Sequence, residues 1–544
     1  MRHFLHTILS AAVITVSAVQ ASAQMGSLPP ARKLQIAEEL IARYYVEPVD
    51  QDTIVEEAIR AMLKTLDPHS AYSTPEETKE LNEPLNGNFS GVGISFNMAS
   101  DTLYVISTIS GGPSERVGIL PGDRIIEVDD TVIAGVKMKN SDVMRRLRGP
   151  KGSRVNVKVL RHKVPDLIDF TITRADIPIY SVDASYMADP TTGYIRISRF
   201  AEQTPKEFAE ALEKLKKEGM KNLIIDLQGN GGGYLNAAQE IAAHFLGKGD
   251  LIVYTDGPNT PSHSYRAPRD GDFRDGRVVV LVDQYSASAS EILSGAIQDH
   301  DRGAVVGRRT FGKGLVQRPF PFPDGSMIRL TVAKYYTPSG RCIQKPYVKG
   351  DLDDYALDIK NRFDSGELMH PDSLSKVMPD SLRFTTLKRQ RTVYGGGGIM
   401  PDVAVPLDTA WFTPYYRDLM AKGLIVRYTI GYIDSHRATL LKEYPTEKAF
   451  ADRFKVTDEM MKALTDNAEA DGVAMKPEEY EKSREYIAMV VKSLLARDLY
   501  DSGSYYRIAN MHNPTFTEGL RLINSPREYD RLLKGDTTNS SDKQ

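Results

Sequence analysis

Two short segments that are apolar along almost their whole length constrain the fold more than any other feature of this chain. Residues 222–227 read NLIIDL and residues 278–282 read VVVLV. A strand that is apolar on both faces must be covered on both faces, as in a parallel sheet. Helical patterns alternate with these strands at 205–218, 234–246 and 288–300. This alternation predicts an α/β core.

The chain has 544 residues, too many for one ordinary domain, so several units are expected. Apolar residues at helical spacing precede the core, short strands with glycine turns follow them, and helical patterns fill the last quarter. We predict a signal peptide at 1–23, a helical N-terminal region at 24–86, a small α+β module at 87–165, a core at 166–345, a polar insertion at 346–392, the end of the core at 393–407, a helical extension at 408–535 and a disordered tail at 536–544.

The first 23 residues have the three parts of a secretory signal: Arg2, an apolar stretch at 8–19 and the small-residue site Ala21-Ser22-Ala23. The alternative, a membrane anchor, needs about 20 apolar residues. No cysteine lies near the cleavage site, which argues against a lipoprotein. No later stretch is apolar enough to span a membrane once the signal is cleaved. We therefore expect an exported protein.

Charge and cysteine content exclude several classes of function. The formal net charge is -3 and no long basic run occurs, which argues against a nucleic-acid partner. Cys342, the only cysteine, cannot form an internal disulfide. It lies in PSGRCIQ without a neighbouring histidine, so we interpret it as a structural residue rather than a nucleophile.

The segment 283–317 contains the residues that we expect to be catalytic. A run of small residues, SASAS, leads from a buried strand into a helix, so Ser288 is expected at a helix N-terminus, where unpaired N–H groups favour an oxyanion. Plain helix capping would explain one serine but not the run of small residues.

A serine nucleophile needs a base, and two candidates follow in sequence. His300 lies 12 residues along the same helix, about 18 Å away at 1.5 Å per residue. Lys313, between two glycines beyond the next strand, is the better candidate if burial keeps it neutral. A surface lysine in a glycine turn is the competing interpretation.

SASASE, QDHDR and FGKGLVQ together resemble the active-site signature of the carboxyl-terminal processing peptidases, or tail-specific proteases. The resemblance implies a crotonase-like α/β serine peptidase core with Ser288 as nucleophile, Lys313 as general base and Gln317 orienting the lysine. It also implies an oxyanion hole made by the amides of Gly232 and Ala289.

Further segments extend the resemblance over most of the chain: LDPHSAY at 66–72, GVGISF at 91–96, ILPGDRIIEVDD at 119–130, GYIRISRF at 193–200, IIDLQGNGGG at 224–233, YYTPSGRCIQ at 335–344 and GGGIMPDV at 396–403. Two positions depart from the family pattern. Gln228 stands where arginine is usual, and Gly231 stands where proline is common.

The module at 87–165 resembles a PDZ domain, which implies capture of peptide C-termini. A glycine turn such as Gly91-Val92-Gly93-Ile94 exposes successive N–H groups that can bind a carboxylate. An ordinary glycine hairpin is the alternative.

Two other functions compete. A non-catalytic scaffold would bind protein tails without cutting them, which intact Ser288, Lys313 and Gln317 argue against. A metal-dependent hydrolase would need ligand spacing, and the ten histidines are scattered with no HExxH motif, so we expect neither metal nor cofactor.

We therefore expect a serine endopeptidase of the bacterial periplasm or cell envelope that processes or degrades envelope proteins. Its partners would be proteins or peptides with free C-termini, and the sequence leaves open a homo-oligomer or an adaptor.

Overall fold

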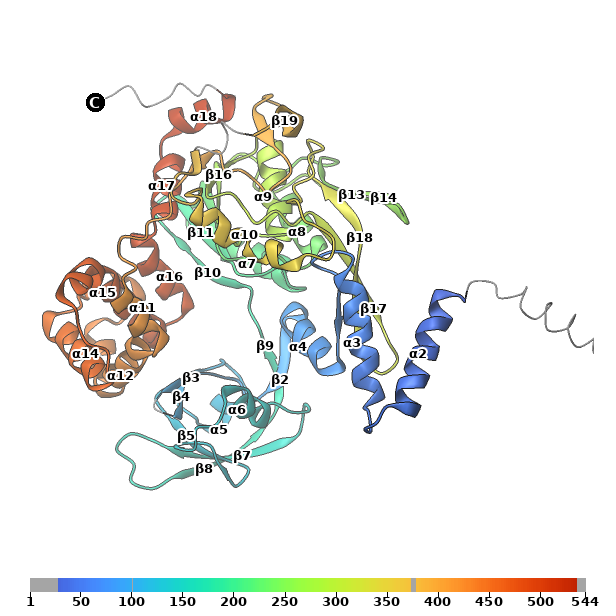
Figure 1. Cartoon of the computed structure of the whole chain (residues 1–544). Helices are drawn as coiled ribbons and strands as arrows, with labels where there is room; N and C mark the ends of the chain where they lie inside the picture. The colour runs from blue at the N-terminus through green and yellow to red at the C-terminus, as the bar shows by residue number, and fades with distance from the viewer. Residues whose placement is uncertain (1–27, 100, 373–377, 536–544) are drawn as a thin grey trace, which may run out of the picture.

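A six-stranded sheet lies at the centre of the computed structural model, which describes residues 28–99, 101–372 and 378–535 (Figure 1). The predicted signal peptide and disordered tail lie outside the described residues. The strand order is β10-β11-β12-β15-β16-β21, and every neighbouring pair is parallel except β10 and β11. The strands are β10 (Val182–Met187), β11 (Thr192–Ile197), β12 (Asn222–Asp226), β15 (Val278–Val282), β16 (Ala304–Gly307) and β21 (Val403–Ala404).

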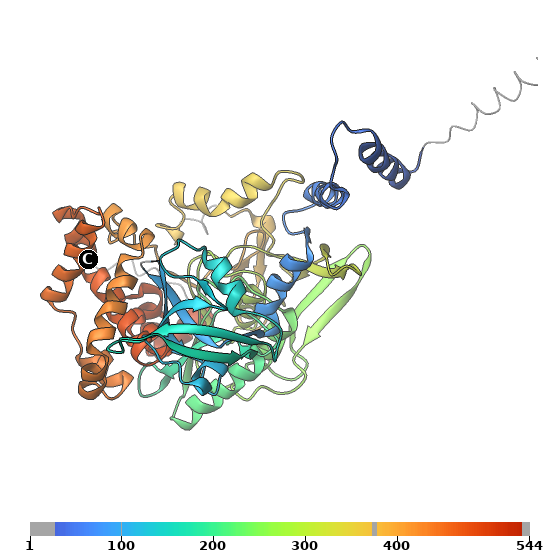
Figure 2. The same cartoon turned by 90° about the horizontal axis from the view of Figure 1, so that it is seen from below.

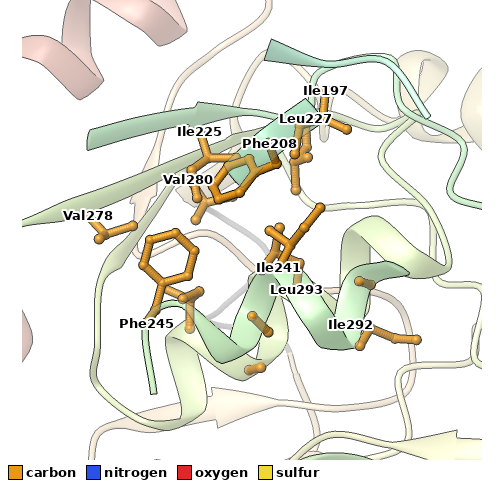
Figure 3. Packing of buried hydrophobic residues seen from close by; sticks show 14 of the residues in the cluster. Ile197, Phe208, Ile225, Leu227, Ile241, Phe245, Val278, Val280, Ile292 and Leu293 are labelled. Atoms are coloured by element: carbon orange, nitrogen blue, oxygen red, sulfur yellow. The ribbon is translucent and has the colours of Figure 1, made fainter. Parts of the chain in front are cut away.

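Three helices cover one face of this sheet: α7 (Thr204–Lys217), α8 (Leu235–Ala243) and α9 (Ala289–Asp299). Their apolar sides meet the strands in a buried cluster (Figure 3). Every residue of β12 and β15 is buried, as expected from their apolar sequences. The predicted α/β core is confirmed.

The opposite face is covered by the end of the chain, α17 (Pro514–Ile523) and α18 (Pro526–Lys534). Phe516 and Ile523 pack against Ile224 and Leu281, and the Tyr529 hydroxyl donates to the Val278 carbonyl at 2.9 Å. The last two helices of the predicted extension therefore pack on the sheet of the core.

A second, antiparallel sheet beside the core was not predicted. It joins β1 (Ala71–Ser73), β13 (Leu251–Gly257), β14 (Thr260–Arg266), β17 (Leu315–Pro321) and β18 (Met327–Tyr336). Because β1 belongs to the N-terminal region and pairs with β18, this sheet fastens residues 66–73 to the core. The N-terminal helices are α2 (Pro30–Tyr44), α3 (Gln51–Lys64) and α4 (Pro75–Asn86); α2 projects away from the body (Figure 2).

A two-stranded antiparallel ribbon connects the small α+β module to the core. Its strands are β2 (Asn88–Gly91) and β9 (Ala175–Pro178). The sheet of the module has the order β3-β4-β5-β7-β8, so β3 is an edge strand. The other elements are β3 (Ile94–Ala99), β4 (Thr102–Thr108), α5 (Pro113–Val117), β5 (Arg124–Val128), β6 (Thr131–Val132), α6 (Asn140–Leu147), β7 (Arg154–Leu160) and β8 (Ile168–Thr173). It has its own apolar core.

The polar segment 346–392 forms α10 (Leu352–Asp364), β19 (Arg383–Thr385) and β20 (Thr392–Tyr394). Its polar sequence predicts a surface insertion, yet the Arg362 side chain is buried. The guanidinium pairs with Glu367, which Arg309 of the core also contacts. The segment is thereby packed onto the core.

The helical extension has a core of its own before it reaches α17. Its helices are α11 (Pro414–Ala421), α12 (Leu424–Glu443), α13 (Glu447–Arg453), α14 (Asp458–Ala470), α15 (Pro477–Leu499) and α16 (Ser502–Ala509). This bundle also touches the small module: Ile106 packs on Ile430, and Arg124 pairs with Asp434 at 2.8 Å.

Candidate active site

Ser288 is the N-cap residue of α9, in the tight turn that follows β15. Its φ of 57° and ψ of -113° are rare for a residue with a side chain, and such backbone costs about 1–3 kcal/mol. Asp283 stabilises the turn, because its Oδ1 accepts hydrogen bonds from the backbone N–H groups of Tyr285 and Ser286. The strand, the turn and the helix together hold a half-buried serine in a strained, defined position.

Glu291, one turn into α9, joins the serine to the lysine. Its Oε2 accepts the backbone N–H of Ser288 at 2.8 Å and that of Lys313 at 2.9 Å. Its Oε1 accepts the Thr310 hydroxyl at 2.5 Å and the Gly312 amide at 2.7 Å. One buried carboxylate therefore brings the two segments together, although they are 25 residues apart in sequence.

Sequence reasoning missed Glu291. The available signal was the Ser-x-x-Glu spacing of a capping box, here Ser288 and Glu291. Complete burial raises the pKa of Glu291 to about 7. Its four hydrogen bonds act in the opposite direction, because they stabilise the carboxylate form.

Lys313 lies between β16 and β17 and is half-buried. Burial is the main cause that lowers its pKa, and the positive charge of Arg329 adds to it; together they bring the pKa to about 8. Glu291 and Asp67 act in the opposite direction. A lysine with this pKa is partly neutral near pH 7–8, which is the form that can accept a proton.

Gln317, on β17, belongs to a hydrogen-bond network that includes residues of the N-terminal region. Its Nε2 donates to the Thr331 hydroxyl at 3.2 Å, and that hydroxyl donates to Asp67 Oδ1 at 2.9 Å. Asp67 also accepts the Ser70 hydroxyl at 2.5 Å. The segment 66–73, which ends in β1, is therefore part of the site.

His69 of the same segment is a second neighbour of the lysine. Its Nε2 lies 2.8 Å from the hydroxyl of Tyr355, a residue of α10. Burial, reinforced by the charge of Lys313, lowers the pKa of His69 to about 4, so the imidazole is neutral at pH 7. His300, in contrast, caps the far end of α9 and contacts the Leu251 carbonyl.

The glycine loop after β12 lies against the serine. A Cβ added to Gly232, where φ is 101°, would lie 2.8 Å from the Ser288 Cβ and 3.0 Å from the Ala289 nitrogen. The Gly232 amide donates to Asn230 Oδ1 at 2.8 Å. Ala289 is the first residue of α9, where a backbone N–H has no partner within the helix. Binding of an oxyanion by both amides would therefore require Asn230 to release Gly232.

In the small module, the four predicted tail-binding residues run from the end of the ribbon strand β2 to the start of the edge strand β3. Gly91 ends β2 and pairs with Ala175, so it belongs to the ribbon. The Val92 carbonyl accepts the amide and hydroxyl of Ser114, and the Gly93 carbonyl accepts the Ile109 amide. Ile94 begins β3, whose outer edge has no neighbouring strand in the sheet.

The described residues offer neither a metal site nor a membrane-spanning helix. In the ranges described above, no group of three or more His, Cys, Asp or Glu side chains could hold a metal ion. None of the described helices combines the length and apolar character needed to cross a membrane. Burial raises the pKa of the Cys342 thiol, which keeps it protonated and unreactive.

Family models match four parts of the chain. They are the activating protease CtpB N-terminal domain (residues 6–78), the PDZ domain (90–172), peptidase family S41 (191–353) and a family of unknown function, DUF8443 (415–501).

Individual relatives agree with these models. The carboxy-terminal processing protease CtpB of Bacillus subtilis is 36% identical over 357 residues, which cover 64% of this chain and 72% of that protein. The carboxy-terminal-processing protease of Bartonella bacilliformis is 34% identical, over 58% of this chain and 72% of that one. Among solved structures, the photosystem II D1 C-terminal processing protease is 30% identical over 57% of this chain and 83% of that chain, with a TM-score of 0.33. The chain therefore belongs to the carboxy-terminal processing protease family and is an S41 serine peptidase with a PDZ domain.

Proposed function

We propose that the chain is an exported endopeptidase that captures protein tails with its PDZ domain and cleaves them near the C-terminus by a Ser288–Lys313 dyad. The single observation that carries the dyad is Glu291, which binds the backbone N–H groups of both residues through one carboxylate oxygen. The lowered pKa of Lys313 supports the same assignment.

In the first half of the reaction, neutral Lys313 accepts the Ser288 hydroxyl proton while Oγ attacks the carbonyl carbon of the scissile peptide. The negative charge that develops on the carbonyl oxygen is held by the Ala289 amide and, once Asn230 releases it, by the Gly232 amide. The tetrahedral intermediate then breaks its C–N bond. Protonated Lys313 gives its proton to the leaving nitrogen, and an ester remains on Ser288.

In the second half, Lys313 takes a proton from water, whose oxygen attacks the ester carbon. The C–O bond to Ser288 breaks, and the serine oxygen recovers a proton from Lys313. The product has a new carboxylate. In this scheme Gln317, Thr331 and Asp67 are positioning residues that keep β17 and β18 aligned beside the lysine.

The PDZ role is supported by the free edge of β3. A peptide tail can add to β3 as a further antiparallel strand, with its carboxylate at the Val92-Gly93-Ile94 turn. Matched peptides test this step: one with a free C-terminus and one amidated. Amidation removes the charge and should slow cleavage markedly, whereas equal rates would refute carboxylate capture.

The signal-like first 23 residues and the bacterial relatives support export to the periplasm or envelope, where the substrates would be envelope proteins. Comparing the C-termini of an exported proteome between wild type and Ser288→Ala tests this part of the proposal. Tails shortened only with the active enzyme are expected. No difference in exported tails would contradict it.

A homo-oligomer is supported by α2 and the turn after it. Helix α2 has no buried residue, while Leu40, Tyr44 and Val46 expose apolar side chains, Val46 to 88%. Light scattering on the purified protein would report the mass, and a monomer at every concentration would exclude an oligomer.

The decisive variants are Ser288→Ala and Lys313→Ala, assayed with a tail peptide. Nucleophile and base act as a unit, so either change should abolish turnover. The exposed Ser264 and Lys217 give matched controls, Ser264→Ala and Lys217→Ala, which should keep wild-type rates. Turnover by Lys313→Ala near the wild-type rate would refute the dyad.

A further inference from the structure

A cavity of about 380 Å³ lies where the peptidase core meets the helical extension, at the carboxyl ends of the parallel strands. Its core side is formed by Gln228 after β12, Asp283 after β15 and Arg308 after β16. Ligands of open α/β sheets commonly bind outside the carboxyl ends of the strands. The volume is within the range of small-molecule sites.

Arg308 is the unusual group in this cavity. Only 8% of the residue is exposed, yet it forms no ion pair with any carboxylate in the part of the chain that the structure describes. Its Nε donates to Gln284 Oε1 at 2.8 Å, and its two terminal nitrogens donate no hydrogen bond to a described residue. Buried arginines are normally paired, because desolvating an unpaired charge is costly.

The neighbouring charges limit what can pair with Arg308. Arg196 also lines the cavity, but it already pairs with Asp226 at 2.7 Å. Asp283 and Asp408 line the cavity as well. Their negative charges disfavour a dianion such as phosphate, whereas a single carboxylate matches the planar fork of one guanidinium.

The other side of the cavity includes a group of aromatic side chains. Trp411 stacks on Tyr486 with ring centroids 3.5 Å apart, and Tyr505 and Tyr506 lie beside them. The rest of this side includes the polar residues Asn510, His512 and Asn513. Flat aromatic walls favour a flat apolar body. We propose that this cavity is a second binding site, separate from Ser288, that takes a small aromatic monocarboxylate with its carboxylate on Arg308.

The chain supplies its own probe for this site, because Trp411 is its single tryptophan. Tryptophan fluorescence is followed while the purified full-length protein is titrated with benzoate, and separately with benzamide, its neutral analogue of the same shape. We expect a saturable change with benzoate and at least about tenfold weaker binding of benzamide, a difference of about 1.4 kcal/mol.

Arg308→Gln should remove the preference for benzoate, while Arg417→Gln, an exposed arginine on α11, should leave it unchanged. The benzoate–benzamide comparison needs only the wild-type protein, so misfolding of Arg308→Gln would not affect it. No saturable response to benzoate, or equal binding of the two probes by the wild type, would overturn the assignment.

Discussion

Glu291→Gln is the perturbation that best tests how the active site is held together. The glutamine has nearly the shape of the glutamate but only one acceptor oxygen. In its better orientation the oxygen keeps the amides of Ser288 and Lys313, and the NH₂ group faces the Thr310 hydroxyl and the Gly312 amide. The Thr310 hydroxyl can rotate to accept a hydrogen bond from this NH₂ group. The Gly312 N–H, however, then faces the N–H donors of the glutamine and has no acceptor.

One buried donor without a partner costs about 1–3 kcal/mol. If that cost displaces Lys313, which follows Gly312 directly, kcat/KM for a tail peptide should fall by roughly 5- to 150-fold, since 1.4 kcal/mol corresponds to a factor of ten. The melting temperature should fall as well.

A second readout separates positioning from simple loss of stability. The negative charge of Glu291 raises the pKa of Lys313, so its removal should move the rising limb of the pH–rate profile to lower pH. The exposed Glu213 on α7 provides a control, Glu213→Gln, which should change neither rate nor profile. A Glu291→Gln enzyme with the wild-type rate and pH midpoint would refute this account of Glu291.

Three further predictions concern the oxyanion loop, the domain contact and metals. Gly232→Ala should abolish cleavage, because the new Cβ would lie 2.7 Å from the Ala287 carbonyl oxygen. The control Gly231→Ala should be nearly neutral, because its Cβ would meet nothing within 4 Å. Equal activities of the two variants would contradict the assignment of the Gly232 loop to the oxyanion hole. A double-mutant cycle of Arg124→Ala and Asp434→Ala, followed by thermal melting, should give a coupling of about 0.5–3 kcal/mol, and additive effects would show that the PDZ–helical contact is not formed. A chelator should leave cleavage unchanged, and loss of activity restored by zinc would contradict serine–lysine chemistry.

The fold was predictable where burial shapes the sequence. Strands β12 and β15 are apolar on both faces and were located from that pattern alone. Strand β17 was missed because it contains Pro319 and Pro321 and exposes most of its residues, which hides the usual strand signal. The second sheet therefore became visible only in the structure.

The active-site residues that lie in short sequence motifs were predictable. Ser288 and Lys313 lie in short motifs, so residue types and a family resemblance were enough to propose them. The contact of Asp67 with Thr331 joins residues 264 positions apart, and no local pattern reports such a pairing. The hydrogen bond that occupies the Gly232 amide likewise depends on the loop conformation.

The pH dependence of serine labelling tests the central claim most directly. A fluorophosphonate reagent, which forms a phosphonate ester with an active serine and releases fluoride, is applied between about pH 6 and pH 10, and the labelled residue is identified by mass spectrometry. The dyad predicts modification at Ser288, with a rate that rises about tenfold per pH unit below a midpoint near pH 8, the pKa of Lys313, and levels off above it. Lys313→Met should not be labelled at an appreciable rate. A pH-independent rate, or labelling of Lys313→Met as fast as the wild type, would contradict the claim that Lys313 activates Ser288.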